Sequence, residues 1–119
     1  MYIIGGSASK NVAEDLSTLL GQPLADVTVK RFVDGECYVR VDDEVKDEDV
    51  VVVRTTYPDH NIIEMFLLQD AAVEAKAGSI LLVIPYYGYA RQDRKFQDGE
   101  PVSAQVMAKY LSMHADAVV

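Results

Sequence analysis

The sequence predicts an α/β fold, in which a mostly parallel sheet carries helices on both faces and an antiparallel β-hairpin projects from it. The first observation is that short apolar segments, typical of strands buried on both faces, alternate with segments of helical periodicity. The second is a pair of half-buried strand signals that flank Asp34-Gly35, two residues typical of hairpin turns. The chain has 119 residues, half of them hydrophobic and a quarter charged, which fits one folded domain or part of one.

The chain begins with a strand and a helix. Residues 2–4 form a short apolar strand, and Gly5-Gly6-Ser7 turns the chain after it. Ser9 is the expected N-cap of a helix, and Gly21 has the place of a C′ glycine at its end. Between them, apolar residues recur at helical spacing: Val12, Leu16, Leu19 and Leu20.

The hairpin comes next. Residues 27–30 and 37–41 alternate apolar and polar side chains, and Asp34-Gly35 predicts a two-residue turn between them. An isolated two-stranded ribbon is marginally stable in water. We therefore expect the hairpin to rest on another part of the protein or on another subunit.

The second half repeats the alternation of strand and helix. Residues 50–53 and 80–84 are continuous apolar strands. Between them, Asn61 followed by Glu64 resembles a capping box, and the helix that they open is apolar around much of its girth, which predicts burial on two sides. Gly78 is expected to end this helix.

The last elements are a third helix and the start of a strand. Pro101 opens the helix at a position that proline favours. Residues 117–119 begin another strand, and no turn or polar tail closes it. We therefore expect the domain to continue in a longer protein.

Composition argues against several functions. A formal net charge of −8 argues against binding nucleic acid or an anionic membrane through the whole surface, and no apolar run could span a bilayer. Cys37 is the only cysteine, so no internal disulfide or zinc site can form, and without a signal peptide the cytoplasm is the expected location. Acidic residues cluster around Lys46, where we expect a solvated turn: Asp42, Asp43, Glu44, Asp47, Glu48 and Asp49.

A cationic loop follows the strand at 80–84. Arg91, Arg94 and Lys95 lie just past its end, where ligands bind in open α/β sheets, and they predict a phosphate-bearing ligand. The alternative is a solvated loop whose cations pair with the nearby acids Asp93, Asp98 and Glu100. Gly88 and Gly99 bracket this loop and would allow it to move over a ligand.

The hairpin tip offers a second candidate site. Phe32 has the strand parity of Thr28 and Lys30, so its ring is expected on the polar face, where it could stack on a flat ring. Asp34 and Glu36 could accept protons from an exocyclic amine of such a ligand. The alternative is that Phe32 packs against a subunit and that Asp34 only forms the turn.

Other chemical candidates are weaker. The run Gly5-Gly6-Ser7-Ala8-Ser9 lacks the lysine and the glycine spacing of phosphate-binding fingerprints, so it is interpreted as a tight turn. His60 and His114 have no partners at metal-ligand spacing. Three tyrosines are expected to pack around the base of the cationic loop: Tyr86, Tyr87 and Tyr89.

Two motifs resemble those of the ribose-phosphate pyrophosphokinase (phosphoribosyl pyrophosphate synthetase) family, and the match is nearest to its archaeal type. The first is Arg31-Phe32-Val33-Asp34-Gly35-Glu36, in which Val33 departs from the usual Pro or Ser. The second is Tyr89-Ala90-Arg91-Gln92-Asp93-Arg94-Lys95, followed by Gly99-Glu100-Pro101-Val102-Ser103-Ala104. The resemblance covers the whole chain, in order and with compatible spacing.

The resemblance implies a transferase of nucleotide biosynthesis that moves the β,γ-diphosphoryl group of ATP to the 1-hydroxyl of ribose 5-phosphate, with magnesium. It implies two related domains of phosphoribosyltransferase type, of which residues 1–119 are the N-terminal one, truncated at its C-terminal end. It also implies a homo-oligomer in which the two motifs meet across a subunit boundary, as a projecting hairpin would allow.

The resemblance also implies roles for individual residues. Phe32 would stack on adenine, and the stretch Asp34-Gly35-Glu36 would recognise the adenine amine. Arg91 and Gln92 would contact ATP. Further candidates for contacts with ATP or phosphate are Asp93, Arg94 and Lys95.

The remaining machinery of the family lies beyond Val119. It comprises a metal-binding histidine, for which His114 cannot substitute because it precedes the last strand, a ribose-5-phosphate loop and a flexible loop with a catalytic lysine. No catalytic or metal-binding residue is therefore assigned within residues 1–119, and we expect these residues alone to be inactive. The alternative is a non-catalytic, synthetase-associated subunit that binds nucleotide or regulates the enzyme. The reading frame beyond Val119 would discriminate between these two hypotheses. A third hypothesis is a generic α/β nucleotide-binding module, but the match of two motifs argues against it.

Overall fold

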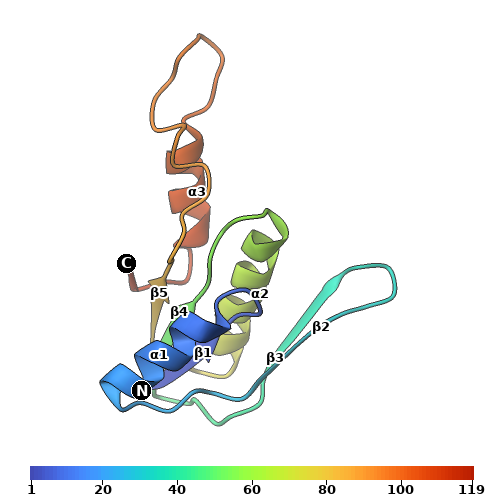
Figure 1. Ribbon diagram of the computed structural model, residues 1–119, viewed down its shortest axis with the longest axis vertical. Coiled ribbons are helices and arrows are strands. Elements are labelled where there is room, and N and C mark those ends of the chain that lie inside the picture. The colour runs from blue at the N-terminus through green and yellow to red at the C-terminus, as the bar shows by residue number, and fades with distance from the viewer.

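The protein is described from a computed structural model that covers all of residues 1–119. Its main sheet has four parallel strands in the order β1 (Tyr2–Gly5), β4 (Asp49–Val53), β5 (Ser79–Val83) and β6 (Ala117–Val118) (Figure 1). These are the apolar segments that the sequence marks as buried strands, and parallel pairing requires that both of their faces be covered.

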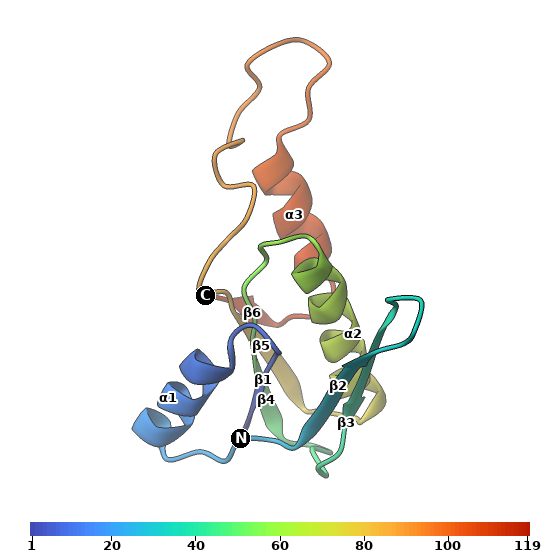
Figure 2. The same cartoon turned by 45° about the vertical axis from the view of Figure 1, so that its right-hand side comes forward.

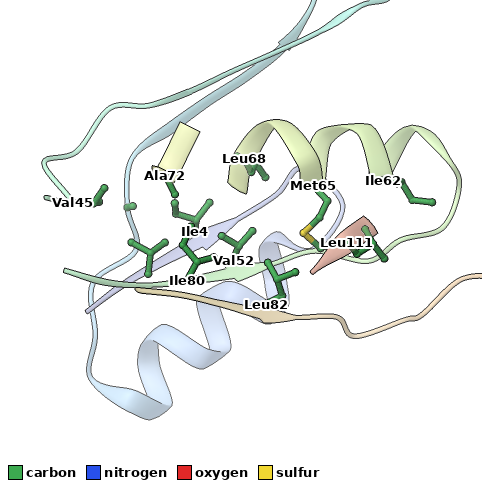
Figure 3. Packing of buried hydrophobic residues seen from close by; sticks show 12 residues of the cluster. Ile4, Val45, Val52, Ile62, Met65, Leu68, Ala72, Ile80, Leu82 and Leu111 are labelled. Carbon is green, nitrogen blue, oxygen red and sulfur yellow. The ribbon is translucent and has the colours of Figure 1, made fainter. Parts of the chain in front are cut away.

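The strands direct alternate side chains to opposite faces, and helices cover both. On one face, Ile3, Val51 and Val53 pack with Ala13 of helix α1 (Lys10–Leu20). On the other face lies α2 (His60–Glu74). Figure 3 shows the two helices on opposite sides of the strands. The predicted architecture of a mostly parallel sheet between helices is therefore confirmed.

The larger core lies on the α2 side. Figure 3 shows Met65, Leu68 and Ala72 directed from α2 toward the strands, where side chains such as Ile4 and Leu82 meet them. Helix α3 (Ser103–Leu111) closes this core with Leu111. Because α2 also contacts strand β3 of the hairpin, its apolar girth is explained by burial on more than one side. None of the helices has the length and apolar character needed to cross a membrane.

The hairpin is a separate two-stranded sheet. Strands β2 (Val27–Arg31) and β3 (Cys37–Val41) pair antiparallel, and Figures 1 and 2 show the ribbon projecting beside α2. Its base is anchored because valines of both strands pack against the larger core. Its tip has no such support, and Val33 there is fully exposed.

The hairpin turn is longer than the sequence predicts. The Phe32 N–H donates to the Glu36 carbonyl at 2.9 Å, and the Gly35 N–H donates to the Phe32 carbonyl at 2.9 Å. The loop therefore has three residues, 33–35, and not the two of an Asp34-Gly35 turn. Gly35 has φ 94°, so it serves as the left-handed residue that follows a turn and forms a bulge.

The predicted capping box at the start of α2 is wrong. Asp59 is the N-cap residue and makes no side-chain capping bond. Asn61 and Glu64 lie inside the helix, and both side chains are buried against Arg54. A sequence pattern that would satisfy the free N–H groups of a helix end here supplies acceptors to one nitrogen of a buried guanidinium, Arg54 Nη2.

Two other predicted boundaries also move. Helix α2 ends at Glu74, and Lys76 takes the left-handed turn after it with φ 62°, two residues before Gly78, which was expected to end the helix. Gly78 meets a different need, because a Cβ atom there would lie 2.8 Å from the Asp47 carbonyl oxygen. Helix α3 begins at Ser103, so Pro101 precedes the helix and does not occupy its first turn.

The larger core gives a direct test of the packing. We expect Leu68→Ala to lower the free energy of unfolding by about 2–5 kcal/mol, because it removes a fully buried side chain and leaves a cavity. Leu19→Ala is the matched control, since Leu19 is 82% exposed and should cost no more than about 0.5 kcal/mol. Urea unfolding monitored by circular dichroism would measure both variants, and equal losses would contradict the assigned core.

Candidate functional site

The carboxyl ends of the parallel strands meet at one edge of the sheet, and the polar chemistry of the domain gathers there. The turn after β1 carries Gly6 and Ser7, β4 runs into Arg54, and β5 leads into the long loop that reaches α3. Figure 2 shows this loop extending away from the sheet, beyond the end of α3. This is the edge at which open α/β sheets bind ligands.

A buried ion pair organises this edge. The Arg54 side chain is fully buried, and its Nη2 lies 2.8 Å from Glu64 Oε2 and also donates to the Asn61 side-chain oxygen. Glu64 in turn accepts the Ser7 backbone N–H at 2.8 Å and the Ser7 hydroxyl at 2.9 Å. Burial lowers the pKa of Arg54, and the negative charge of Glu64 opposes that shift. One carboxylate thus joins strand β4, helix α2 and the turn after β1.

The glycine turn after β1 is shaped by this pair. A Cβ atom on Gly6 would overlap the Arg54 side chain and lie 3.0 Å from Glu64 Oε1. The Ser7 N–H, which a phosphate-binding turn would offer to its ligand, is already donated to Glu64. These contacts support the interpretation of this run as a tight turn.

Arg54 is a residue of this edge that was not predicted from the sequence. The available signal was a cation directly after a continuous apolar strand, together with a glutamate within the most apolar helix. Both charges lie where only a paired charge is tolerated, so each predicts a partner. Because the spacing of Asn61 and Glu64 also fits a capping box, both residues were assigned to the start of the helix and not to Arg54.

Tyrosines hold the base of the cationic loop, as expected. The Tyr87 hydroxyl donates to the Ala104 carbonyl at 2.6 Å, and the Tyr86 ring contacts the Tyr57 ring edge-on. The Tyr89 hydroxyl donates to Asp59 Oδ1 at 2.7 Å, and this bond raises the pKa of Tyr89. The loop is therefore tied to the start of α2 and to α3 before its cations begin.

The cations of the loop are free. Arg91, Arg94 and Lys95 are exposed, and none of them belongs to an ion pair, so the alternative in which nearby acids neutralise them is not formed. The Arg94 guanidinium lies over the Phe96 ring, 5.2 Å from its centroid. Asp93 is exposed beside them and forms no ion pair. The loop thus presents uncompensated positive charge to solvent.

Gln92 connects the cations to helix α3. Its N–H donates to the Tyr89 carbonyl at 3.1 Å, its carbonyl accepts the Ala104 N–H at 3.1 Å, and its side-chain oxygen accepts the Ser103 hydroxyl. A cavity of about 340 Å³ lies beside it. The cavity is lined by Arg91, Gln92, Arg94, Phe96, Glu100 and Pro101.

The hairpin tip places its ring as the strand parity predicts. Phe32 is 49% exposed, and its ring meets the edge of the Tyr38 ring at 5.8 Å between centroids. Tyr38 pairs with Lys30, whose Nζ lies 4.8 Å from the Tyr38 ring centroid, so the three side chains share the polar face. This face is an aromatic and cationic surface open to solvent.

The acids of the tip are exposed beside that surface. Asp34 Oδ1 accepts the Glu36 N–H at 3.0 Å, and Arg31 donates to the Gly35 carbonyl at 3.2 Å. The Glu36 carboxylate makes no hydrogen bond or ion pair within the chain. These contacts hold the loop of the tip in shape and leave one carboxylate free for a ligand.

The two candidate halves do not meet within one chain. Both views in Figures 1 and 2 show the hairpin and the cationic loop projecting from the domain in different directions, with their tips well apart. A larger cavity of about 750 Å³ lies between α2 and α3, and it is lined mostly by apolar side chains. Tyr89 and Asp59 lie at its margin, but neither the hairpin tip nor the cations take part in it.

The histidines have separate surroundings. His114 Nε2 lies 3.8 Å from Asp70 Oδ1, and His60 begins helix α2. Nowhere in the chain do three or more His, Cys, Asp or Glu side chains gather closely enough to hold a metal ion.

The fold places the chain among α/β domains of phosphoribosyltransferase type. A purine phosphoribosyltransferase from Pyrococcus horikoshii superposes on 73% of the chain with a TM-score of 0.51 and 23% identity, a likeness of fold alone. The phosphoribosylpyrophosphate synthetase of Mycobacterium smegmatis superposes on 98% of the chain with a TM-score of 0.86 and 29% identity, over 40% of its own length.

Sequence comparison then gives the family. The family described as the N-terminal domain of ribose phosphate pyrophosphokinase matches residues 1–114, so the chain belongs to the ribose-phosphate pyrophosphokinase family. The ribose-phosphate pyrophosphokinase of Saccharolobus solfataricus is 44% identical over 94% of the chain, and that of Halobacterium salinarum is 43% identical over 98%. The chain spans 39% and 42% of the lengths of these two relatives.

The buried pair can be tested by a double-mutant cycle. We expect Glu64→Leu to lower the free energy of unfolding by about 3–5 kcal/mol, because it leaves the buried Arg54 charge without its partner. Adding Arg54→Met should restore most of this loss, since two apolar side chains can replace a buried pair. Urea unfolding of the two single variants and the double variant measures the coupling, and additive losses would show that the charges act independently.

Proposed function

We propose that this chain supplies the ATP-binding part of a ribose-phosphate diphosphokinase, which transfers diphosphate from ATP to ribose 5-phosphate. The observation that carries the proposal is the membership of residues 1–114 in this family together with the exposure of both motifs. We assign residues 1–119 to an N-terminal phosphoribosyltransferase-like domain. The transfer itself is assigned to the whole protein, in line with relatives about two and a half times as long.

The hairpin tip would bind the adenine. The half-exposed Phe32 ring offers a flat face for stacking, and its contact with Tyr38 limits its movement. Asp34 and Glu36 on either side of Gly35 would accept hydrogen bonds from the exocyclic amine. Because Gly35 forms the bulge that turns the chain, it places both acids at the tip.

The cationic loop would bind the phosphates. Arg91 and Gln92 lead this assignment, since Gln92 is fixed to helix α3 and Arg91 is unpaired beside it. Arg94 and Lys95 add positive charge, and Asp93 could receive a hydrogen bond from the nucleotide. Each charge-assisted hydrogen bond contributes about 1.5–3 kcal/mol, so two or three would hold a polyphosphate firmly. Positioning and charge neutralisation are also what phosphoryl transfer chiefly requires.

The separation of the two halves favours a site built from two copies. One copy would contribute the hairpin and the other the loop, so that a complete site exists only in a homo-oligomer. The exposed Val33 at the tip is consistent with a hairpin that reaches a neighbour. A cytoplasmic location stays a prediction, based on the single cysteine.

Magnesium would enter with the nucleotide. The residues of this chain do not form a cluster of metal-ligating side chains, so they fit a protein-held Mg²⁺ poorly. We therefore place the ion on the ATP phosphates and assign it no ligand here.

The ATP assignment is testable in the complete protein. We expect Phe32→Ala to weaken ATP binding by about 1–3 kcal/mol, because the stacking surface is lost. We expect Arg91→Ala to weaken it by about 1.5–3 kcal/mol, through loss of a charge-assisted contact. Isothermal titration calorimetry with ATP and Mg²⁺ would measure both affinities.

Two exposed positions outside both motifs provide controls for this experiment. Leu19→Ala changes an exposed side chain of helix α1, and Arg40→Ala removes an exposed cation that pairs with Asp42. Both should bind ATP as the unaltered protein does. Unchanged ATP affinity in the Phe32 and Arg91 variants would contradict the assignment of these residues to the ATP site.

The sharing of one site by two copies predicts complementation. Copies with Phe32→Ala and copies with Arg91→Ala each lack one half of every site, but random mixing should give about one quarter of sites with both halves intact. The measurement is product formation from ATP and ribose 5-phosphate after subunit exchange between the two variants of the complete protein. If the mixture were no more active than either variant alone, the halves would not be shared between copies.

A further inference from the structure

The start of the cationic loop is held by side chains that follow strand β4. Thr56 is almost fully buried, and its Oγ1 accepts the Gly88 N–H at 2.7 Å. The same hydroxyl donates to the Tyr86 carbonyl at 3.2 Å, and the Thr56 N–H donates to that carbonyl at 3.0 Å. One threonine thus fixes the chain on both sides of position 87.

A second contact holds the next residue. Tyr89 has φ 68°, a left-handed conformation that residues other than glycine rarely adopt, so its neighbours must hold it there. Its hydroxyl donates to Asp59 at 2.7 Å, close to the start of helix α2. The backbone direction at position 89 is therefore fixed from both sides: by Thr56 through Gly88, and by Asp59 through the ring.

Gly88 also has a packing role, and movement of the loop about Gly88 stays a prediction. A Cβ atom there would lie 3.2 Å from the Thr56 carbonyl oxygen and 3.4 Å from Thr56 Oγ1. Glycine is therefore favoured at this position because the backbone of β4's extension approaches it closely. Gly99, at the far side of the loop, has φ 86° and nothing near its missing Cβ.

The two contacts determine where the cations begin. Arg91 lies between Tyr89 and Gln92, and the Gln92 N–H donates back to the Tyr89 carbonyl at 3.1 Å. A rotation at position 89 would therefore swing Arg91 and displace Gln92 from helix α3. The direction of the Arg91 side chain thus depends on residues that need not touch any ligand.

We propose that Thr56 and Tyr89 are positioning residues for ATP: Thr56, through Gly88, and Tyr89, through Asp59, hold Arg91 and Gln92 in the geometry that binds the phosphates. The inference rests on the proposed function, and it gives a role to Thr56, which lies outside both motifs, and to Tyr89, which begins the second motif but had no role in ligand binding assigned to it. Their effect on the nucleotide is indirect, because their hydroxyl groups are used within the protein.

The test compares hydroxyl deletions in the complete protein, with ATP and Mg²⁺ as the probe. Thr56→Val removes the hydroxyl but keeps the shape, and it should weaken ATP binding by about tenfold, the scale of one lost hydrogen bond. Thr56→Ser keeps the hydroxyl and should restore affinity to within about twofold. Tyr89→Phe, which removes only the hydroxyl of a partly exposed side chain and should fold normally, should weaken binding by about three- to tenfold.

Thr55→Val is the matched control. The Thr55 hydroxyl also donates to the Tyr86 carbonyl, at 3.2 Å, but it does not reach Gly88. This variant should bind ATP within about twofold of the unaltered protein. Amide hydrogen exchange of residues 89–95 gives a readout independent of ATP, and it should accelerate in Thr56→Val but not in Thr55→Val.

The outcomes separate the two hypotheses. If the unaltered protein binds ATP, while Thr56→Val and Tyr89→Phe bind it equally well, the positioning role is overturned, even when their melting temperatures fall. If the unaltered protein does not bind ATP, the proposed function is overturned and the positioning role for ATP is overturned with it. Weakened binding in both variants, with recovery in Thr56→Ser, supports the inference.

Discussion

The buried contact between Arg54 and Glu64 is the interaction on which the carboxyl edge of this domain depends. Removing two charges from water costs several kcal/mol each. The Glu64 carboxylate offsets part of this cost through its bonds to the Arg54 Nη2 atom and to Ser7, while Arg54 Nε and Nη1 are buried without a hydrogen-bond partner. Those bonds fix the turn after β1, the end of β4 and the first turns of α2 relative to one another. The segment that follows Arg54 then starts from a fixed point, and it carries Thr56 and Asp59, which hold the cationic loop.

The domain therefore combines a rigid edge with two exposed projections. The loop is fixed at its start by contacts from the segment between β4 and α2, and at Gln92 by contacts with α3. The hairpin is anchored at its base by valines packed on the larger core and is free at its tip. In a site assembled from such parts, the contacts that fix the loop and the base of the hairpin determine the geometry within each half. The distance between the two halves depends on how two copies associate.

Most of the sheet could be predicted from the sequence because strands buried on both faces require continuous apolar runs, and these are unambiguous. Errors arose where one local pattern serves two structures. A glycine after aspartate fits a two-residue turn, but it equally fits the bulge that Gly35 forms. Asn61 and Glu64 have the spacing of a cap, yet they bind Arg54. The contact between Thr56 and Gly88 depends on the packing of β4 beside β5, which no local pattern reveals. The residues named for ATP are exposed as expected, and their roles stay predictions.

The unpaired cations of the loop belong to a chain whose formal net charge is −8. An anion that approaches from a distance meets an overall repulsive field, and it is attracted only once it is near the loop. At physiological ionic strength the Debye length is about 8 Å, so remote acids are largely screened while cations in contact with the anion are not. Lowering the salt concentration accelerates the capture of a polyphosphate by proteins with a broadly basic surface. We therefore expect no such acceleration for this chain. Selection among anions then depends on the fit to a few fixed donors and not on accumulated charge.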